Sequence, residues 1–162
     1  MQNLTPNVGY GAKFANWTPT VVTGSALVHT YSATSGPDST PGWTLSCTGT
    51  SATLNLVSNT LYVAPDEQFL VLSVTLKVSN TANSTVQPFS VAFSDVAGSA
   101  VGAAVVPIAA VAALNTTTHI QYTGLVTVPV GAVTAVATLV GYNWTSTGGY
   151  NVIVSNPQVL VP

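Results

Sequence analysis

Few side chains in this sequence are good acids, good bases or strong metal ligands. Among its 162 residues are two histidines, one cysteine, four carboxylates and two lysines, with no arginine. His29 and His119 lie far apart, and neither has a carboxylate within four positions. Because catalytic and metal sites need such groups to converge, we expect no enzymatic activity, no metal and no other cofactor.

The acidic side chains and the cysteine have simple structural explanations. Asp66, Glu67 and Asp95 stand in segments rich in Pro, Gly and Ala, where a carboxylate accepts backbone N–H bonds of a turn. Cys47 is the only cysteine, so it forms no disulfide within the chain. We expect it to be a buried strand residue.

Aromatic residues near expected loops are the candidate binding groups. Trp43 follows a Pro-Gly pair, Trp144 stands between Asn and Thr, and Tyr150 follows a Gly-Gly pair. An exposed ring stacks on the apolar face of a sugar, while neighbouring polar side chains bond its hydroxyls. We predict neutral-glycan contacts at Trp144, Trp43 and Tyr150, with edge packing or a subunit contact as the alternative. Trp17 is expected in the core.

The segment at 69–79 carries the clearest strand pattern of the chain. Alternate positions are apolar from Leu70 to Val78, and the positions between them include Ser73, Thr75 and Lys77. Strict alternation predicts a β-strand with one buried and one wet face. A second alternating run, at 86–94, predicts the returning strand of a hairpin.

The remaining segments indicate an all-β protein. No stretch keeps a helical apolar period, and Thr and Val runs alternate with Gly, Pro and Asn. About eight short antiparallel strands predict a β-sandwich, most naturally a jelly roll, forming one domain over 1–162. Further strands are expected at 21–30, 44–47, 53–58, 103–111, 118–128, 132–142 and 150–161.

The near absence of charge excludes several classes of partner. Charged residues make up 4% of the chain, against about 25% in ordinary globular proteins. Two lysines are too few to neutralise phosphates, so we expect neither nucleic-acid nor membrane-surface binding. A surface of Ser, Thr, Asn and Ala favours burial against neighbours or contact with neutral sugars.

No targeting segment is evident in the sequence. The first residues, Met-Gln-Asn-Leu-Thr-Pro-Asn, contain neither a basic nor an apolar signal-peptide region. The stretch at 96–114 is uncharged, but it is rich in Ala and Gly and contains Pro107, which argues against a membrane span.

Several short motifs resemble carbohydrate-binding modules of the family 4/9 type and related galactose-binding-like jelly rolls. The opening Asn3-Leu4-Thr5-Pro6-Asn7, with Phe14 and Trp17, resembles their first-strand pattern. The segments at 63–69, 91–98 and 128–132 resemble, in the same order, their turn into a strand, a hairpin and the entry to the penultimate strand. The closing strand corresponds to 150–161.

This resemblance implies a jelly-roll fold and a sugar-binding or virion-surface role, since such modules are frequent in phage tail, fibre and head proteins. Two positions depart from the pattern: Asn156 replaces an acidic residue and Asp66 replaces a turn glycine. Members often hold a structural Ca²⁺, but four scattered carboxylates do not predict that ion here.

Two functions with the same fold follow from these observations. We expect first a non-catalytic virion-surface subunit, such as a phage decoration, fibre or minor tail protein, that packs as a homo-oligomer beside other virion proteins. The alternative is a carbohydrate-binding module for adhesion to polysaccharide. The chain starts with Met and enters its strand motifs at once, which favours a self-contained subunit.

Overall fold

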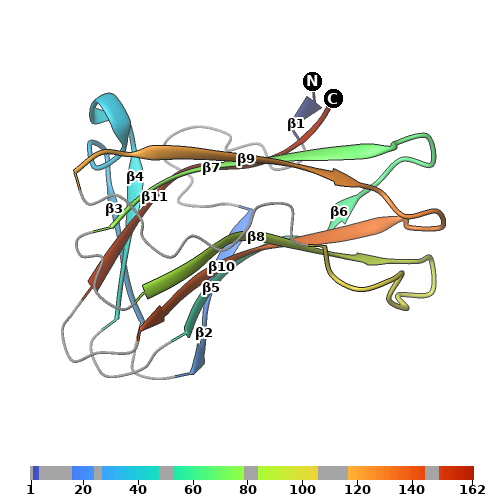
Figure 1. Ribbon diagram of the computed structural model, residues 1–162, viewed down its shortest axis with the longest axis horizontal. Helices are drawn as coiled ribbons and strands as arrows, with labels where there is room; N and C mark the ends of the chain where they lie inside the picture. Colours follow the sequence, from blue (N-terminus) through green and yellow to red (C-terminus); the bar gives the residue numbers. More distant parts are fainter. Residues whose placement is uncertain are drawn as a thin grey trace.

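A computed structural model of the chain describes residues 2–3, 16–23, 27–47, 53–78, 84–105, 117–144 and 150–162. The described part consists almost entirely of β-strands in two facing antiparallel sheets, as Figure 1 shows. The predicted all-β jelly-roll sandwich is therefore confirmed. The strands are β1 (Gln2–Asn3), β2 (Trp17–Thr23), β3 (Leu27–Ser32), β4 (Gly42–Cys47), β5 (Thr53–Ser58), β6 (Leu61–Tyr62), β7 (Phe69–Val78), β8 (Ser84–Ser94), β9 (Ile120–Thr127), β10 (Thr134–Trp144) and β11 (Tyr150–Val161).

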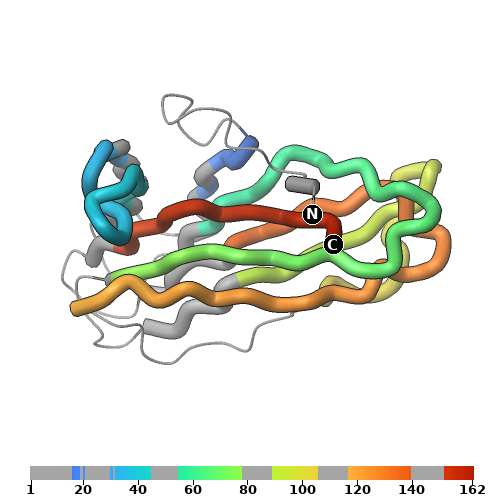
Figure 2. Tube along the Cα trace, turned by 90° about the horizontal axis from the view of Figure 1, so that it is seen from above, coloured from blue at the N-terminus to red at the C-terminus, as the bar shows by residue number. Residues whose placement is uncertain are grey.

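One sheet, here called sheet A, has the strand order β3-β4-β11-β7-β9, and β1 also pairs with β11. It forms the upper layer in Figure 1, and Figure 2 looks onto its outer face. β11 is the central strand, lying between β4 and β7. β7 continues the sheet to β9 through an unbroken register from Phe69–Thr127 to Leu76–Ile120.

The second sheet, sheet B, has the order β2-β5-β10-β6, with β8 also paired to β10. β10 pairs with β5 and β6 at different parts of its length. Its pairing with β8 runs from Thr134–Ser94 to Trp144–Ser84. β2 forms one edge through its pairing with β5.

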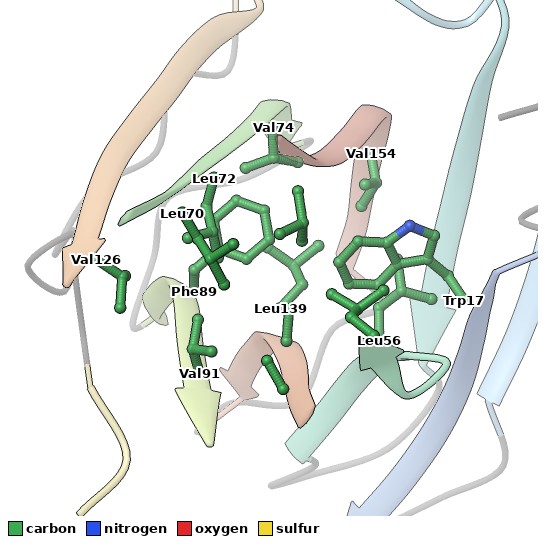
Figure 3. Packing of buried hydrophobic residues seen from close by; sticks show 14 of the residues in the cluster. Trp17, Leu56, Leu70, Leu72, Val74, Phe89, Val91, Val126, Leu139 and Val154 are labelled. Carbon is green, nitrogen blue, oxygen red and sulfur yellow. The ribbon is translucent and has the colours of Figure 1, made fainter. Parts of the chain in front are cut away.

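The core lies between the sheets and is built by alternate residues of their strands (Figure 3). Phe89 from sheet B is fully buried, and its ring centroid lies 6.3 Å from that of Trp17. Trp17 is 3% exposed, which confirms the prediction that it belongs to the core. Sheet A contributes Leu70, Leu72, Val74, Leu76, Val152, Val154 and Val159.

Alternation in the predicted strand at 69–79 is confirmed along β7. Leu70, Leu72 and Val74 are fully buried, whereas Thr75 and Lys77 are only partly buried. The exception is Ser73, which faces outward yet is 6% exposed. Other strands agree with their expected ranges within a few residues, and 53–58 and 150–161 agree at both ends.

Two expected strands are corrected by the structure. The segment 21–30 contains the end of β2 and the start of β3, which belong to different sheets. The sequence hid this change because only the short stretch Thr23-Gly24-Ser25 interrupts the apolar run. The segment 103–111 is not a strand in its described part, where Val105 forms only an isolated bridge to Val91; residues 106–111 lie outside the described residues.

Candidate functional site

The outward side of sheet A carries a continuous set of hydrogen-bonding side chains over β11, β7 and β9. The sequences of these three strands contain one charged residue, Lys77. Register places Ser155 beside Thr75 and Thr75 beside Gln121. The next row runs from Gln158 through Ser73 to Thr123. Ser155 itself is 3% exposed. We call the surface formed by the others the polar face: Ser73, Thr75, Gln121, Thr123, Asn156 and Gln158.

A bulge in β11 creates part of the polar face. The register with β7 shifts between Ser155, opposite Thr75, and Gln158, opposite Ser73, so β11 carries one extra residue. Asn156, within the bulge, has a φ of 49° and is exposed. Such a bulge reverses the side-chain phase of a strand. Val159 therefore reaches the core, and Gln158 faces outward.

Hydrogen bonds orient two amide groups on the polar face. Gln121 Nε2 donates to Ser73 Oγ at 3.0 Å. Gln158 Nε2 donates to Asn156 Oδ1 at 2.8 Å. Both bonds fix side chains that would otherwise lose rotamer freedom on binding. The polar face thus presents oriented amides and hydroxyls without a carboxylate.

A compact turn at residues 33–41 stands at one end of the polar face, between β3 and β4 (Figure 2). Gly36 N donates to Thr40 O at 2.8 Å, and Thr40 N donates to Pro37 O at 2.9 Å. A short 3-10 helix, η1 (Pro37–Ser39), lies inside it. Asp38 and Ser39 have φ values of 50° and 60°. Consecutive non-glycine residues in this left-handed region store backbone strain, which concentrates at functional sites.

Glycines allow the turn to lie directly on the strands. A Cβ at Gly42 would come within 2.8 Å of both Ser35 Oγ and Ser155 Oγ. A Cβ at Gly36 would come within 2.7 Å of Pro41 O. The hydroxyls of Ser35 and Ser155 are buried without a hydrogen-bond partner. The turn is therefore packed closely onto β4 and β11 and encloses two unsatisfied polar groups.

His119 joins the turn to the far side of the sheet. Its Nε2 lies 3.0 Å from Ser35 O, and it directly precedes β9. The carbonyl accepts, so the ring donates through an Nε2–H. The histidine therefore links the start of β9 to the turn.

The other end of the outer face is apolar. Register aligns Leu160 with Val71 and Val71 with Leu125. Leu125 is 59% exposed, and Phe69, at the start of β7, is 38% exposed. Tyr122, on the opposite side of β9, packs against the core, and burial raises the pKa of its phenol. A ligand lying along the strands would meet polar groups and then apolar ones.

Of the three predicted glycan-contact residues, only Trp43 has a described side chain, and it does not lie on the polar face. Trp43 is 7% exposed and belongs to the core, so its ring is not the exposed loop aromatic that we expected. The reason is that β4 begins at Gly42, and alternation then directs Trp43 inward. Trp144 ends β10 and Tyr150 begins β11. Their side chains lie outside the described part, and their glycan role stays a prediction.

The turn role of Asp95 is confirmed. Its Oδ1 accepts from Ala97 N at 2.9 Å and from Ser99 N at 2.8 Å. Gly98 completes this turn with a φ of 80°. Within the described ranges, no group of three or more His, Cys, Asp or Glu side chains is placed to hold a metal ion. None of the helices described there is long and apolar enough to cross a membrane.

Sequence reasoning missed most of the polar face. It identified the outward side of β7 but not its neighbours, because strand order is set by long-range pairing. One local signal was present: the core valines of β11 change phase, from Val152 and Val154 to Val159 and Val161. The Asn-Pro pair at 156–157 between them is typical of a bulge or turn.

Comparisons with known proteins bear on the fold. No protein-family model matches the chain, and no curated protein matches its sequence. Among solved structures, the enzymatically active domain of tailspike protein 4 from bacteriophage CBA120 is similar over 99% of this chain, with 21% identity and a TM-score of 0.70. The chain spans only 21% of that domain's length.

Two carbohydrate-binding modules are also similar. The xylan-binding CBM22-1 domain of Paenibacillus barcinonensis Xyn10C has a TM-score of 0.57 and 13% identity over 90% of this chain and 85% of its own. A family 11 module of Clostridium thermocellum, solved with a β-1,3-1,4-mixed-linked tetrasaccharide, has a TM-score of 0.53 and 15% identity over 90% and 89% of the two chains. The chain therefore has a carbohydrate-binding-module-like jelly-roll fold, as its motifs indicated.

Proposed function

We propose that this chain is a non-catalytic β-sandwich that binds neutral polysaccharide through the polar face. The observation that carries the proposal is the composition of that face, which consists of amides and hydroxyls on three strands whose one charged residue is Lys77. The hydroxyls of a neutral glycan both donate and accept hydrogen bonds. Amide and hydroxyl side chains can pair with them in both directions. The fold shared with a xylan-binding domain supports the same function.

The apolar end of the outer face suits the same ligand. A pyranose ring has a face of C–H groups, which gains free energy when it covers apolar side chains. Leu125 is exposed beside Val71, one row from Thr123 and Ser73. A glycan chain crossing β11, β7 and β9 would bond its hydroxyls to the polar rows and cover the apolar row.

Titration with soluble xylan and with mixed-linked β-glucan tests this proposal. We expect the double variant Gln121→Ala/Gln158→Ala to lose at least about tenfold in affinity, since it removes two oriented amides from the face. Thr18→Ala, at an exposed position in sheet B, is the matched control and should bind normally. Binding should change little with salt because few charges are available to be screened.

The same titration separates this site from the one expected from sequence. If Trp144→Ala abolishes binding while the double variant binds like the parent chain, the loop aromatics hold the glycan and the polar face does not. If neither polysaccharide binds the parent chain at millimolar concentration, the proposal is wrong.

A second function is an oligomeric structural subunit at a phage virion surface, in contact with copies of itself and other virion proteins. The similarity to a tailspike domain over 99% of this chain supports it. The low charge supports it too, because a surface of Ser, Thr and Ala provides little of the charge repulsion that prevents monomers from associating. Size-exclusion chromatography with light scattering tests this function; a monomer at high micromolar concentration would contradict it.

A further inference from the structure

β9 forms one edge of sheet A. It pairs with β7 on one side, and no other strand in the described part of the chain pairs with it. Its register with β7 is continuous over eight residues, without a bulge. Edge strands of this kind expose unpaired backbone donors and acceptors that can pair with another chain.

The hydrogen-bond phase identifies which backbone groups face the open edge. Val128 N donates to Gln68 O at 2.9 Å, so this pair is a hydrogen-bonded one. Pair types alternate along an antiparallel ladder. The neighbouring Thr127–Phe69 pair is therefore non-hydrogen-bonded. The pairs that Leu125, Thr123 and Gln121 form with β7 are of the same type. The N–H and C=O groups directed away from β7 belong to Gln121, Thr123, Leu125 and Thr127.

β9 lacks the protection that the edges of sheet B have. The far side of β8 is covered by residues 100–105, through bridges at Val91–Val105 and Ser94–Ala100. β2 carries Pro19 and a register shift. β9 has no charged residue, no proline and no bulge, while Leu125 on it is 59% exposed. An uncharged, regular and partly apolar edge is suited to pairing with an equivalent edge.

We propose that β9 pairs antiparallel with β9 of a second copy of this chain, about a two-fold axis at Gly124. Side chains directly opposite each other must lie on the same face of the sheet. This axis satisfies that condition by placing Thr123 opposite Leu125 and Gln121 opposite Thr127. The four residues of each copy whose backbone groups point away from β7 then each form two backbone hydrogen bonds with the opposite residue of the other copy. Gly124, at the axis, presents no side chain to its counterpart.

The pairing would join two copies of sheet A into one sheet. Because the axis is perpendicular to the sheet, both polar faces lie on the same side. Two binding faces held side by side raise avidity for a long polysaccharide without any new contact. This inference deepens the proposed oligomeric function and rests on it; the gain in avidity rests also on the proposed glycan binding.

Disulfide trapping tests the register in the absence of glycan. In a Cys47→Ser background, a Thr123→Cys chain mixed with a Leu125→Cys chain should form a cross-linked heterodimer, since opposed Cα atoms lie about 5.5 Å apart. A mixture of Leu125→Cys and Thr127→Cys chains is the matched control and should not cross-link. Equal cross-linking of both mixtures, or of neither, would overturn the proposed register.

Light scattering of edge variants tests the interface itself. We expect Thr123→Pro and Leu125→Lys to convert the dimer to monomer, while Val130→Lys, fully exposed off the strand, leaves it intact. Thermal melts establish that each variant is folded. An oligomer unchanged by both edge variants would overturn pairing through β9 and leave oligomerisation standing. A monomeric parent chain would overturn both.

Discussion

Phe89→Ala is expected to lower the free energy of unfolding by about 3–5 kcal/mol, the range for truncating a fully buried aromatic side chain. Phe89 has no exposed surface and lies at the centre of the core, among side chains from both sheets (Figure 3). Its ring also lies beside that of Trp17. The rigid strands around it limit collapse into the vacated space, so most of the cavity should persist. Urea denaturation followed by tryptophan fluorescence measures the change.

Phe69→Ala is the matched control for this prediction. Phe69 starts β7 on the outer side of sheet A and is 38% exposed. The same truncation there leaves no enclosed cavity, so we expect a loss of less than about 1 kcal/mol. Comparable losses at the two positions would mean that the core is not centred between the sheets at Phe89.

The strands could be predicted where neighbouring residues in the sequence alternate between buried and outward positions. β7 alternates strictly, with Leu70, Leu72 and Val74 in the core, and such a pattern defines both the strand and its buried face. The closing strand and the strand at 53–58 were equally clear because turn residues bound them. Turn chemistry likewise placed Asp95, whose carboxylate accepts two backbone N–H bonds.

Other features depend on pairing between distant segments. Trp43 was placed in a loop because its strand was expected to begin at residue 44, whereas β4 begins at Gly42 and alternation along it directs Trp43 into the core. The polar face required the knowledge that β11, β7 and β9 are neighbours. The contact between His119 and the turn at 33–41 joins residues 84 positions apart in the sequence. None of these follows from local periodicity.

The turn at 33–41, beside the polar face, is a tightly constrained segment of the described chain. Its closeness to the sheet depends on two glycines, and it holds the hydroxyls of Ser35 and Ser155 without partners. Burial of an unpaired hydroxyl costs stability. Asp38 and Ser39 add backbone strain because both have left-handed φ values. The turn keeps this unfavourable conformation only because the surrounding strands enforce it.

Gly36→Ala is therefore expected to destabilise the chain by about 1–3 kcal/mol, as overpacking does in close-packed surroundings. The new Cβ would lie 2.7 Å from Pro41 O and 2.8 Å from Thr40 O. Both are backbone atoms, which move only if the turn moves. Displacement of the turn should also disturb the contact between His119 and Ser35 O. Thermal melts measure the first effect, and the imidazole resonances of His119 in NMR spectra report the second.

Ser155→Ala separates crowding from the loss of a polar contact. The Ser155 hydroxyl has no hydrogen-bond partner, so its removal should leave stability unchanged or slightly higher. In the double variant Gly36→Ala/Ser155→Ala, the clash with the two carbonyls remains, so we expect no rescue of stability. Full rescue would mean that the Ser155 Oγ, 2.8 Å from the added Cβ, is the only atom that resists it. The turn would then be more pliable than its packing on sheet A implies.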